Sequence, residues 1–144
     1  MDSNLIVMRF RDAVRGSFGF LEPRGFREVA DLEHTSPTTA TVTYIGKNVG
    51  FVLSLDLRDR CVDADVVMVS NGRLRRNWEG GYSANLVSHL VKYAGFRGVG
   101  RSNKRTGTDD VDVDGSVDRL AQLLAQFGLT LLEDKPESLP PRAS

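Results

Sequence analysis

Apolar and polar residues alternate through the middle of the chain, in three runs at 40–44, 49–57 and 62–68. A period of two places the apolar side chains on one face of a β-strand. The connections at 46–48 and 58–60 are too short for the crossover that parallel strands require. The pattern therefore predicts a three-stranded antiparallel meander with one buried face.

Three segments outside the meander have helical spacing, at residues 3–15, 82–94 and 114–127. Ser83 would cap the second, with Gly95 and Gly128 ending the second and third. The apolar positions expected to cover the sheet are Leu5, Met8, Phe10 and Val14 in the first segment, Leu86, Val87, Leu90, Val91 and Ala94 in the second, and Val117, Leu120, Ala121, Leu123, Leu124 and Phe127 in the third. His89 is expected to face away from Leu86 and Leu90.

Together these elements predict a single α+β domain over residues 1–132, with N-terminal and C-terminal amphipathic helices packed on the meander. Residues 129–132 would add a short packed extension or a fourth strand. The stretch at about 98–113 is rich in Gly, Ser and Asp and is expected to be a mobile loop. Residues 133–144 carry the Pro and polar content of a flexible C-terminal tail.

Composition limits the class of protein. Of 144 residues, 40% are hydrophobic and 26% are charged. Both fractions are typical of a globular domain. The longest apolar runs fall far short of the ~20 residues that span a bilayer. The acidic second residue is atypical of a signal peptide. We therefore expect a cytoplasmic protein without membrane contact, and the lone Cys61 excludes an intramolecular disulfide.

No stretch of the sequence carries a catalytic motif of useful specificity. The glycines at 95–100 follow a predicted helix, whereas a dinucleotide site needs a strand before them. The acidic run DDVDVDG lacks the glutamate that a calcium loop places six residues after its glycine. His34 and His89 are interpreted as structural. The sequence thus predicts no catalytic, cofactor-binding or metal-binding residue, and favours a binding protein over an enzyme; a small enzyme whose site is assembled only in the fold remains an alternative.

Charge is unevenly distributed although the net charge is zero. Residues 73–105 hold eight basic groups and one acidic group, and residues 106–144 hold three basic and eight acidic groups. The basic segment could bind a nucleic-acid backbone, with Trp78 or Tyr82 stacking on bases. It could equally be neutralised by the acidic segment that follows it. A nucleic-acid-associated accessory protein is therefore the second functional hypothesis.

The N-terminal half also carries a resemblance in layout. A helix, the FGFLEPRGF turn and the strands V-T-Y and V-G-F-V-L-S-L-D-L-R-D follow one another, and two later helices complete the arrangement. Over roughly Asn4 to Val69 this order resembles small bacterial immunity proteins of polymorphic and contact-dependent toxin systems. The resemblance implies a non-enzymatic inhibitor that neutralises a cognate toxin by occluding it.

A partner protein would meet the outward residues of the meander, its charged turns and the aromatic and basic stretch that follows it. Trp, Tyr and Arg dominate binding energy when they reach the centre of an interface, although Trp78 could instead cover the edge of the core. A homodimer formed through an exposed sheet edge is also possible. The candidate partner-binding residues are Asp56, Arg58, Asp59, Asp63, Asp65, Arg75, Arg76, Trp78 and Tyr82.

Overall fold

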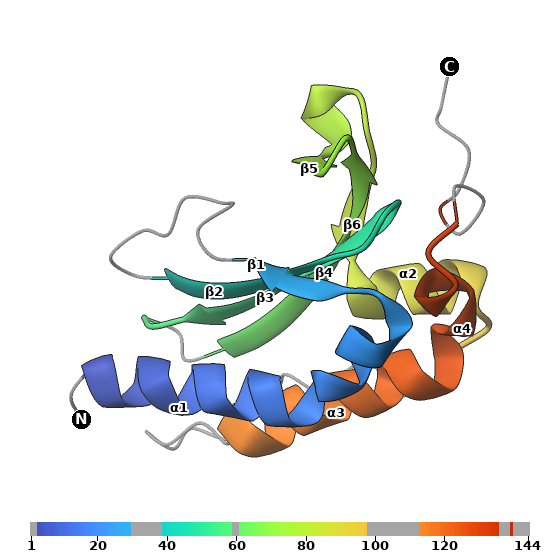
Figure 1. Cartoon of the computed structure of the whole chain (residues 1–144). Helices are drawn as coiled ribbons and strands as arrows, with labels where there is room; N and C mark the ends of the chain where they lie inside the picture. Colours follow the sequence, from blue (N-terminus) through green and yellow to red (C-terminus); the bar gives the residue numbers. More distant parts are fainter. Residues whose placement is uncertain (1–2, 30–38, 59–60, 98–112, 136–138, 140–144) are drawn as a thin grey trace.

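An antiparallel sheet flanked by helices forms the centre of the computed structural model (Figure 1), which describes residues 3–29, 39–58, 61–97, 113–135 and 139. Six strands occur among these residues, so the predicted α+β class is confirmed but the predicted strand number is too low. The elements in chain order are α1 (Ser3–Ser17), η1 (Gly19–Arg24), β1 (Arg27–Val29), β2 (Thr39–Ile45), β3 (Val49–Asp56), β4 (Cys61–Ser70), β5 (Arg73–Arg75), η2 (Asn77–Glu79), β6 (Ser83–Asn85), α2 (Leu86–Tyr93), α3 (Val113–Phe127) and α4 (Leu129–Leu132).

The predicted meander is confirmed as β2, β3 and β4, which pair in sequence order and antiparallel. Val42 pairs with Leu53, and Leu53 pairs with Ala64, so all three side chains lie on the same face of the sheet. This face belongs to the main hydrophobic core. The alternating pattern is therefore consistent with the register of the meander. The prediction of a single buried face is too simple, because Val52 and Val67 on the opposite face are also buried.

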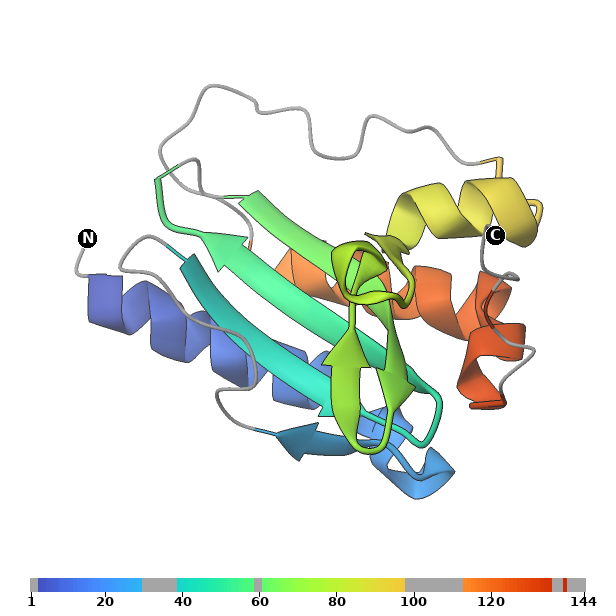
Figure 2. The same cartoon turned by 90° about the horizontal axis from the view of Figure 1, so that it is seen from above.

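Helices α1 and α3 lie next to each other across the apolar face of the sheet (Figure 1). Figure 2 looks onto the opposite face, with both helices behind the strands. On α1 the buried stripe is Ile6, Phe10 and Val14, spaced four residues apart. The prediction for Leu5 and Met8 is wrong, because that stripe turns both side chains outward, where each is 60% exposed.

The FGFLEPRGF segment forms η1 and the turn into β1. Phe18 and Phe26 are buried, and Phe20 is half-buried with its ring stacked 6.2 Å from that of Phe18. Gly25 closes the segment with a φ of 100°. This is a left-handed conformation that glycine adopts without steric cost. The aromatic cluster therefore anchors the link between α1 and the sheet.

The three strands that the sequence pattern did not predict are β1, β5 and β6, each of three residues. None is long enough to show an alternating pattern. Asn71 and Gly72 have φ values of 55° and 75°. Positive φ values at both positions suit the tight turn that returns the chain from β4 to β5. These short strands form because β2 and β4 offer backbone partners, and not because of their own propensity.

Helix α2 begins later than predicted. The Asn85 side chain accepts hydrogen bonds from the backbone N–H groups of Val87 and Ser88. Asn85, and not Ser83, is therefore the cap that satisfies the first turn of the helix. Ser83 lies in β6 instead.

The buried face of α2 also differs from the prediction. His89 follows Leu86 by three residues and therefore shares its buried face, being only 5% exposed. The prediction that His89 faces outward is wrong. Val91 and Ala94, which were expected to cover the sheet, are exposed instead.

Hydrogen bonds anchor the segment after α3 to the sheet. Residues 129–132 form α4, the packed extension, and not a fourth strand of the meander. Beyond it, the Asp134 carboxylate accepts hydrogen bonds from the backbone N–H groups of Lys47, Asn48 (2.7 Å) and Val49 (2.9 Å). Asp134 belongs to the segment predicted to be a flexible tail, of which 136–138 and 140–144 lie outside the described residues, as does most of the 98–113 loop.

Replacement of Asp134 by alanine should lower the free energy of unfolding by about 1.5–3 kcal/mol, because three backbone donors in the β2–β3 turn lose a charged acceptor. Urea denaturation at neutral pH measures this change. The matched control is Glu133→Ala, which removes an exposed carboxylate one residue away. Equal unfolding midpoints for the two variants would contradict a fastening role for Asp134.

Candidate partner-binding site

Strands β5 and β6 are two parts of one strand that a loop interrupts. Arg75 pairs with Met68 of β4, and Ser83 pairs with the adjacent residue, Val67. The chain between these two positions, residues 76–82, leaves the sheet and returns to it. Because the two ladder positions on β4 are consecutive, the sheet itself does not require this excursion, which we call the 76–82 loop.

Hydrogen bonds close the 76–82 loop at its base. The Tyr82 N–H donates to the Arg75 carbonyl at 2.9 Å. The Asn77 side chain pairs with the backbone of Ser83, accepting from its N–H at 3.2 Å and donating to its carbonyl at 2.9 Å. These bonds reduce the conformational entropy of the loop before any partner is present.

Gly81 makes the closure sterically possible. Its N–H donates to the Arg76 carbonyl at 2.9 Å. A Cβ atom at this position would lie 2.0 Å from the Arg75 carbonyl oxygen, far inside van der Waals contact. Sequence reasoning missed the roles of Asn77 and Gly81. The Gly80-Gly81 pair was the available signal, because consecutive glycines typically mark a tight turn.

Trp78 projects from this loop into solvent. Its side chain is 78% exposed, so it does not cover the edge of the core. The guanidinium carbon of Arg76 lies 5.7 Å from the centroid of the indole ring. This separation is within cation–π range. Arg76 Nη1 also lies 3.1 Å from Asp65 Oδ2 on β4. The loop therefore holds a large aromatic side chain in the open and links it to the sheet through Arg76.

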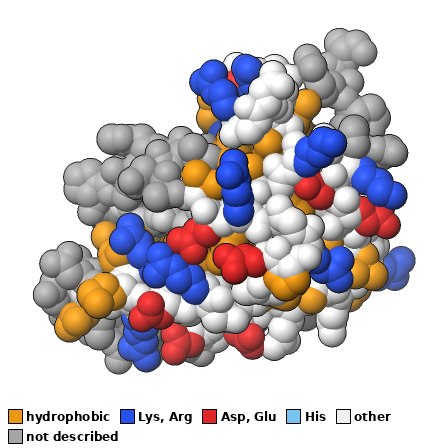
Figure 3. All heavy atoms as spheres, viewed as in Figure 1, with side chains coloured by type: hydrophobic (Ala, Val, Ile, Leu, Met, Phe, Trp, Pro, Cys, Tyr) orange, Lys and Arg blue, Asp and Glu red, His pale blue; other side chains and the backbone are white. Residues whose placement is uncertain are grey.

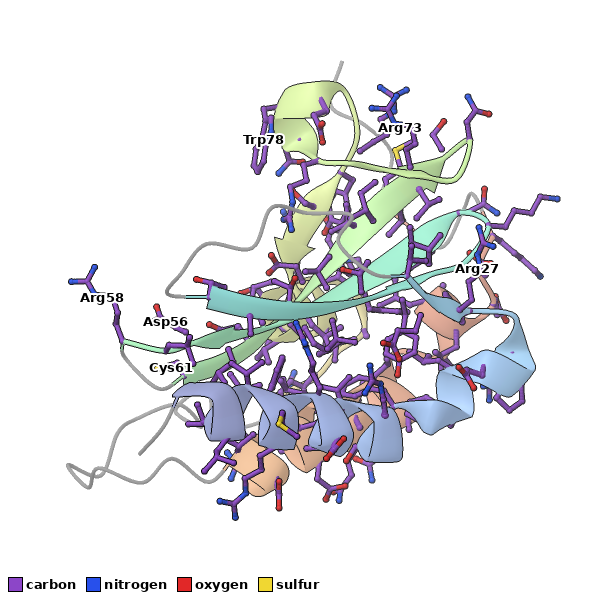
Figure 4. All side chains as sticks on the ribbon, turned by 60° about the vertical axis from the view of Figure 1, so that its left-hand side comes forward. Arg27, Asp56, Arg58, Cys61, Arg73 and Trp78 are labelled. Carbon is purple, nitrogen blue, oxygen red and sulfur yellow. The ribbon has the colours of Figure 1, made fainter. Side chains whose placement is uncertain are left out.

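Three candidate carboxylates lie on the sheet face opposite α1 and α3. Asp63 and Asp65 are two residues apart on β4, so their side chains point the same way. Asp63 pairs with Ser54 of β3, and Asp56 follows Ser54 by two residues, so Asp56 shares this face. We call Asp56, Asp63 and Asp65 the carboxylate strip. Figure 4 labels Asp56 near one end of this surface and Trp78 at the other.

The electrostatics of the strip centre on Asp63. Partial desolvation raises the pKa of the Asp63 carboxyl, and the negative charges of Asp65 and Asp56 raise it further. Asp65 is compensated by Arg76. Asp56 accepts a hydrogen bond from the backbone N–H of Arg58 at 2.8 Å. The strip is thus a row of acidic groups in which the middle member experiences like-charge repulsion.

Two of the candidate residues point elsewhere. Arg75 pairs with Met68, whose side chain lies on the helix side of β4, so Arg75 faces away from the strip. Tyr82 is half-buried beside α2. Arg58 is exposed just beyond β3, and Asp59 lies outside the described residues.

Figure 3 shows basic side chains gathered over β5 and η2, at the top of the view.

Tyr82 and His89 form a partly buried polar contact next to the loop. A hydrogen bond of 2.7 Å joins Tyr82 Oη to His89 Nδ1. Burial lowers the pKa of His89. The pKa of Tyr82 is raised to about 12, mainly by burial and to a smaller extent by the nearby Tyr93. Both rings are therefore neutral near pH 7, and Tyr82 is not poised as a nucleophile. The contact anchors the return arm of the loop to α2.

The described part of the chain contains no cluster of three or more His, Cys, Asp or Glu side chains arranged to hold a metal ion. Among the same residues, no helix has the length and apolar character needed to cross a membrane. Comparison of the sequence with protein-family models, with curated proteins and with solved structures finds no match. The proposed binding site therefore rests on the geometry of this chain.

Stability should depend on His89 in a defined pH range. Because the pKa of His89 is lower in the folded protein than the ordinary value of 6.5, the unfolded chain binds the proton more readily. Stability should be highest above pH 6.5 and fall as pH decreases toward the folded-state pKa. Urea midpoints between about pH 5.5 and 7.5 measure this slope. The same slope in His89→Gln would show that another group causes it.

Gly81→Ala should open the base of the loop, because the new methyl group collides with the backbone of Arg75. We expect a changed Trp78 fluorescence spectrum and a loss of stability of about 1–3 kcal/mol, measured by urea unfolding. The control is Gly16→Ala, where an added Cβ meets no atom within 4 Å. An unchanged spectrum and stability in Gly81→Ala would argue against a closed loop.

Proposed function

We propose that this chain is a non-enzymatic protein-binding domain that contacts its partner through Trp78 and the 76–82 loop. The supporting observation is an indole ring that is 78% exposed on a loop closed by its own hydrogen bonds. Exposed tryptophan is unfavourable in water, so holding it outside the core has a physical cost. Burial of the ring against a partner would recover that cost.

The residue types around Trp78 suit an interface. Trp and Arg are enriched among the side chains that dominate binding free energy. Arg76 already contacts both the indole ring and Asp65, so little rotamer freedom remains to be lost on binding. The loop would therefore act as a preformed anchor for the partner, with the exposed polar side chains of the neighbouring sheet face forming the rim of the contact.

The role we propose for this domain is that of an immunity-like inhibitor, which neutralises a bacterial toxin by occluding its functional surface. Occlusion requires shape and charge complementarity but no catalytic group. A rigid projection such as the 76–82 loop is suited to entering a concave surface. The layout resemblance of residues 4–69 to immunity proteins of toxin systems motivates this role.

The competing hypothesis of nucleic-acid binding through residues 73–105 is less well supported by the arrangement of charges. Arg75 and Trp78 do not converge on one surface, because Arg75 faces the helix side of the sheet. The carboxylates of Asp63 and Asp65 lie on the face that Arg76 contacts, and they would repel a phosphate backbone. We therefore retain nucleic-acid binding only as an outcome of the experiment below.

Trp78→Ala should abolish partner capture while leaving the fold intact, because the side chain is exposed. The change in stability should stay within about 0.5 kcal/mol, as is usual for a surface substitution. Affinity capture from the source cells, after nuclease treatment and a moderate-salt wash, should recover one stoichiometric protein with the original chain only. Leu129→Ala is the matched control, because it truncates another exposed apolar side chain, 56% accessible, on α4.

The captured protein should arrest growth when expressed alone, and co-expression with this chain should restore growth. Co-expression with Trp78→Ala should not. A protein bound equally by the original chain and by Trp78→Ala would contradict the proposed site. Recovery of nucleic acid alone, lost after nuclease treatment, would contradict the proposed function and favour the basic segment.

A further inference from the structure

We infer that the surface of the partner is cationic, with arginine or lysine side chains that meet the carboxylate strip and the exposed ring of Trp78 together. This inference rests on the proposed function and specifies the chemistry of the partner. Two independent features of the same surface support it, namely the charge of the sheet face and the cation–π environment of the indole ring.

The strip and the ring form one continuous surface. Asp65 contacts Arg76, and Arg76 contacts the ring of Trp78. Asp63 precedes Asp65 by two residues on β4. The rise of a strand places their Cα atoms about 6.5 Å apart on the same face. Asp56 continues the row on the neighbouring strand, diagonally across from Asp63. A single partner segment can therefore contact the aromatic end and the acidic end at once.

The acidic end favours a positive group. The Asp63 side chain is accessible to solvent and lies next to two other carboxylates. Partial desolvation, followed by the charges of Asp65 and Asp56, raises its pKa. The Arg76 guanidinium lies at the other end of the carboxylate strip, where it contacts Asp65. A cation brought by the partner would pair with the ionised form of Asp63 and relieve the repulsion from its neighbours. Binding should accordingly weaken as Asp63 becomes protonated at low pH.

The aromatic end favours the same class of group. The guanidinium carbon of Arg76 lies 5.7 Å from the centroid of the Trp78 ring. A guanidinium can therefore reach cation–π range of this ring. The 78% exposure of Trp78 leaves ring surface available for a second cation. Arginine in the partner could thus stack on the indole while a neighbouring basic side chain reaches Asp63.

The decisive variant is the double substitution Asp56→Asn/Asp63→Asn, which removes two negative charges and nearly preserves side-chain shape. The control is Asp12→Asn/Asp118→Asn, which removes the same charge from exposed positions on α1 and α3. Both helices pack on the opposite face of the sheet. Any effect of net charge alone appears equally in both variants.

Two ligands are titrated at low ionic strength, an octa-arginine peptide and the protein captured through Trp78, with fluorescence of the only tryptophan as the readout. Asp56→Asn/Asp63→Asn should weaken both interactions about fivefold or more, and the effect should shrink with added salt. The control should change them less than twofold. An octa-glutamate peptide should not alter the fluorescence.

Equal weakening by the two double variants, or tighter binding of octa-glutamate than of octa-arginine, would overturn the inference. A Trp78-dependent partner whose affinity is unchanged in Asp56→Asn/Asp63→Asn would also overturn it while leaving the proposed function intact. If no captured protein depends on Trp78, the proposed function fails, and the peptide titrations then decide separately whether this surface selects cations.

Discussion

The outer edge of β4 is the constraint on which the candidate site depends. One edge of β4 pairs with β3 over residues 61–68, and the other edge needs partners for its own backbone groups. Two short strands supply them, with β5 opposite residues 68–70 and β6 opposite residues 65–67. Because β5 and β6 pair with the same edge of β4, the 76–82 loop between them starts and ends beside adjacent residues of β4.

The two faces of the sheet have separate roles. One face joins α1 and α3 in the main hydrophobic core, with side chains such as Phe51 and Leu53 fully buried. The other face carries the carboxylate strip and receives the Arg76 guanidinium. The carboxylate face also buries Val52 and Val67. Substitutions at its exposed positions, such as Asp63, can still change recognition with little effect on folding.

The long elements were predictable from the sequence, because many residues repeat the same period in each. The meander and the helices α1 and α3 follow directly from periods of two and of three to four. The short strands were not predictable, since Arg73–Arg75 and Ser83–Asn85 are ordered by the edge of β4 and lack an apolar pattern of their own. His89 was misplaced because a polar residue was assumed to face outward, whereas Tyr82 satisfies it inside.

The part of the candidate site that lies on the long strands was also predictable from their period of two. Alternation within β3 and β4 was enough to place Asp56, Asp63 and Asp65 on one face. The separation of Arg75 from Trp78 depends on where the chain leaves the sheet, and sequence spacing does not contain that information. Closure of the loop by Asn77 and Gly81 likewise depends on contacts with residues that only the folded strand brings close.

The proposed binding mode requires the 76–82 loop to hold Trp78 rigidly in solvent before any partner binds. Time-resolved fluorescence anisotropy of the free protein tests it directly, because Trp78 is the only tryptophan in the chain. A rigidly held ring should lose anisotropy mainly at the rate at which the whole domain tumbles. A dominant, much faster decay would show a ring that moves independently of the domain, and would contradict a rigid loop.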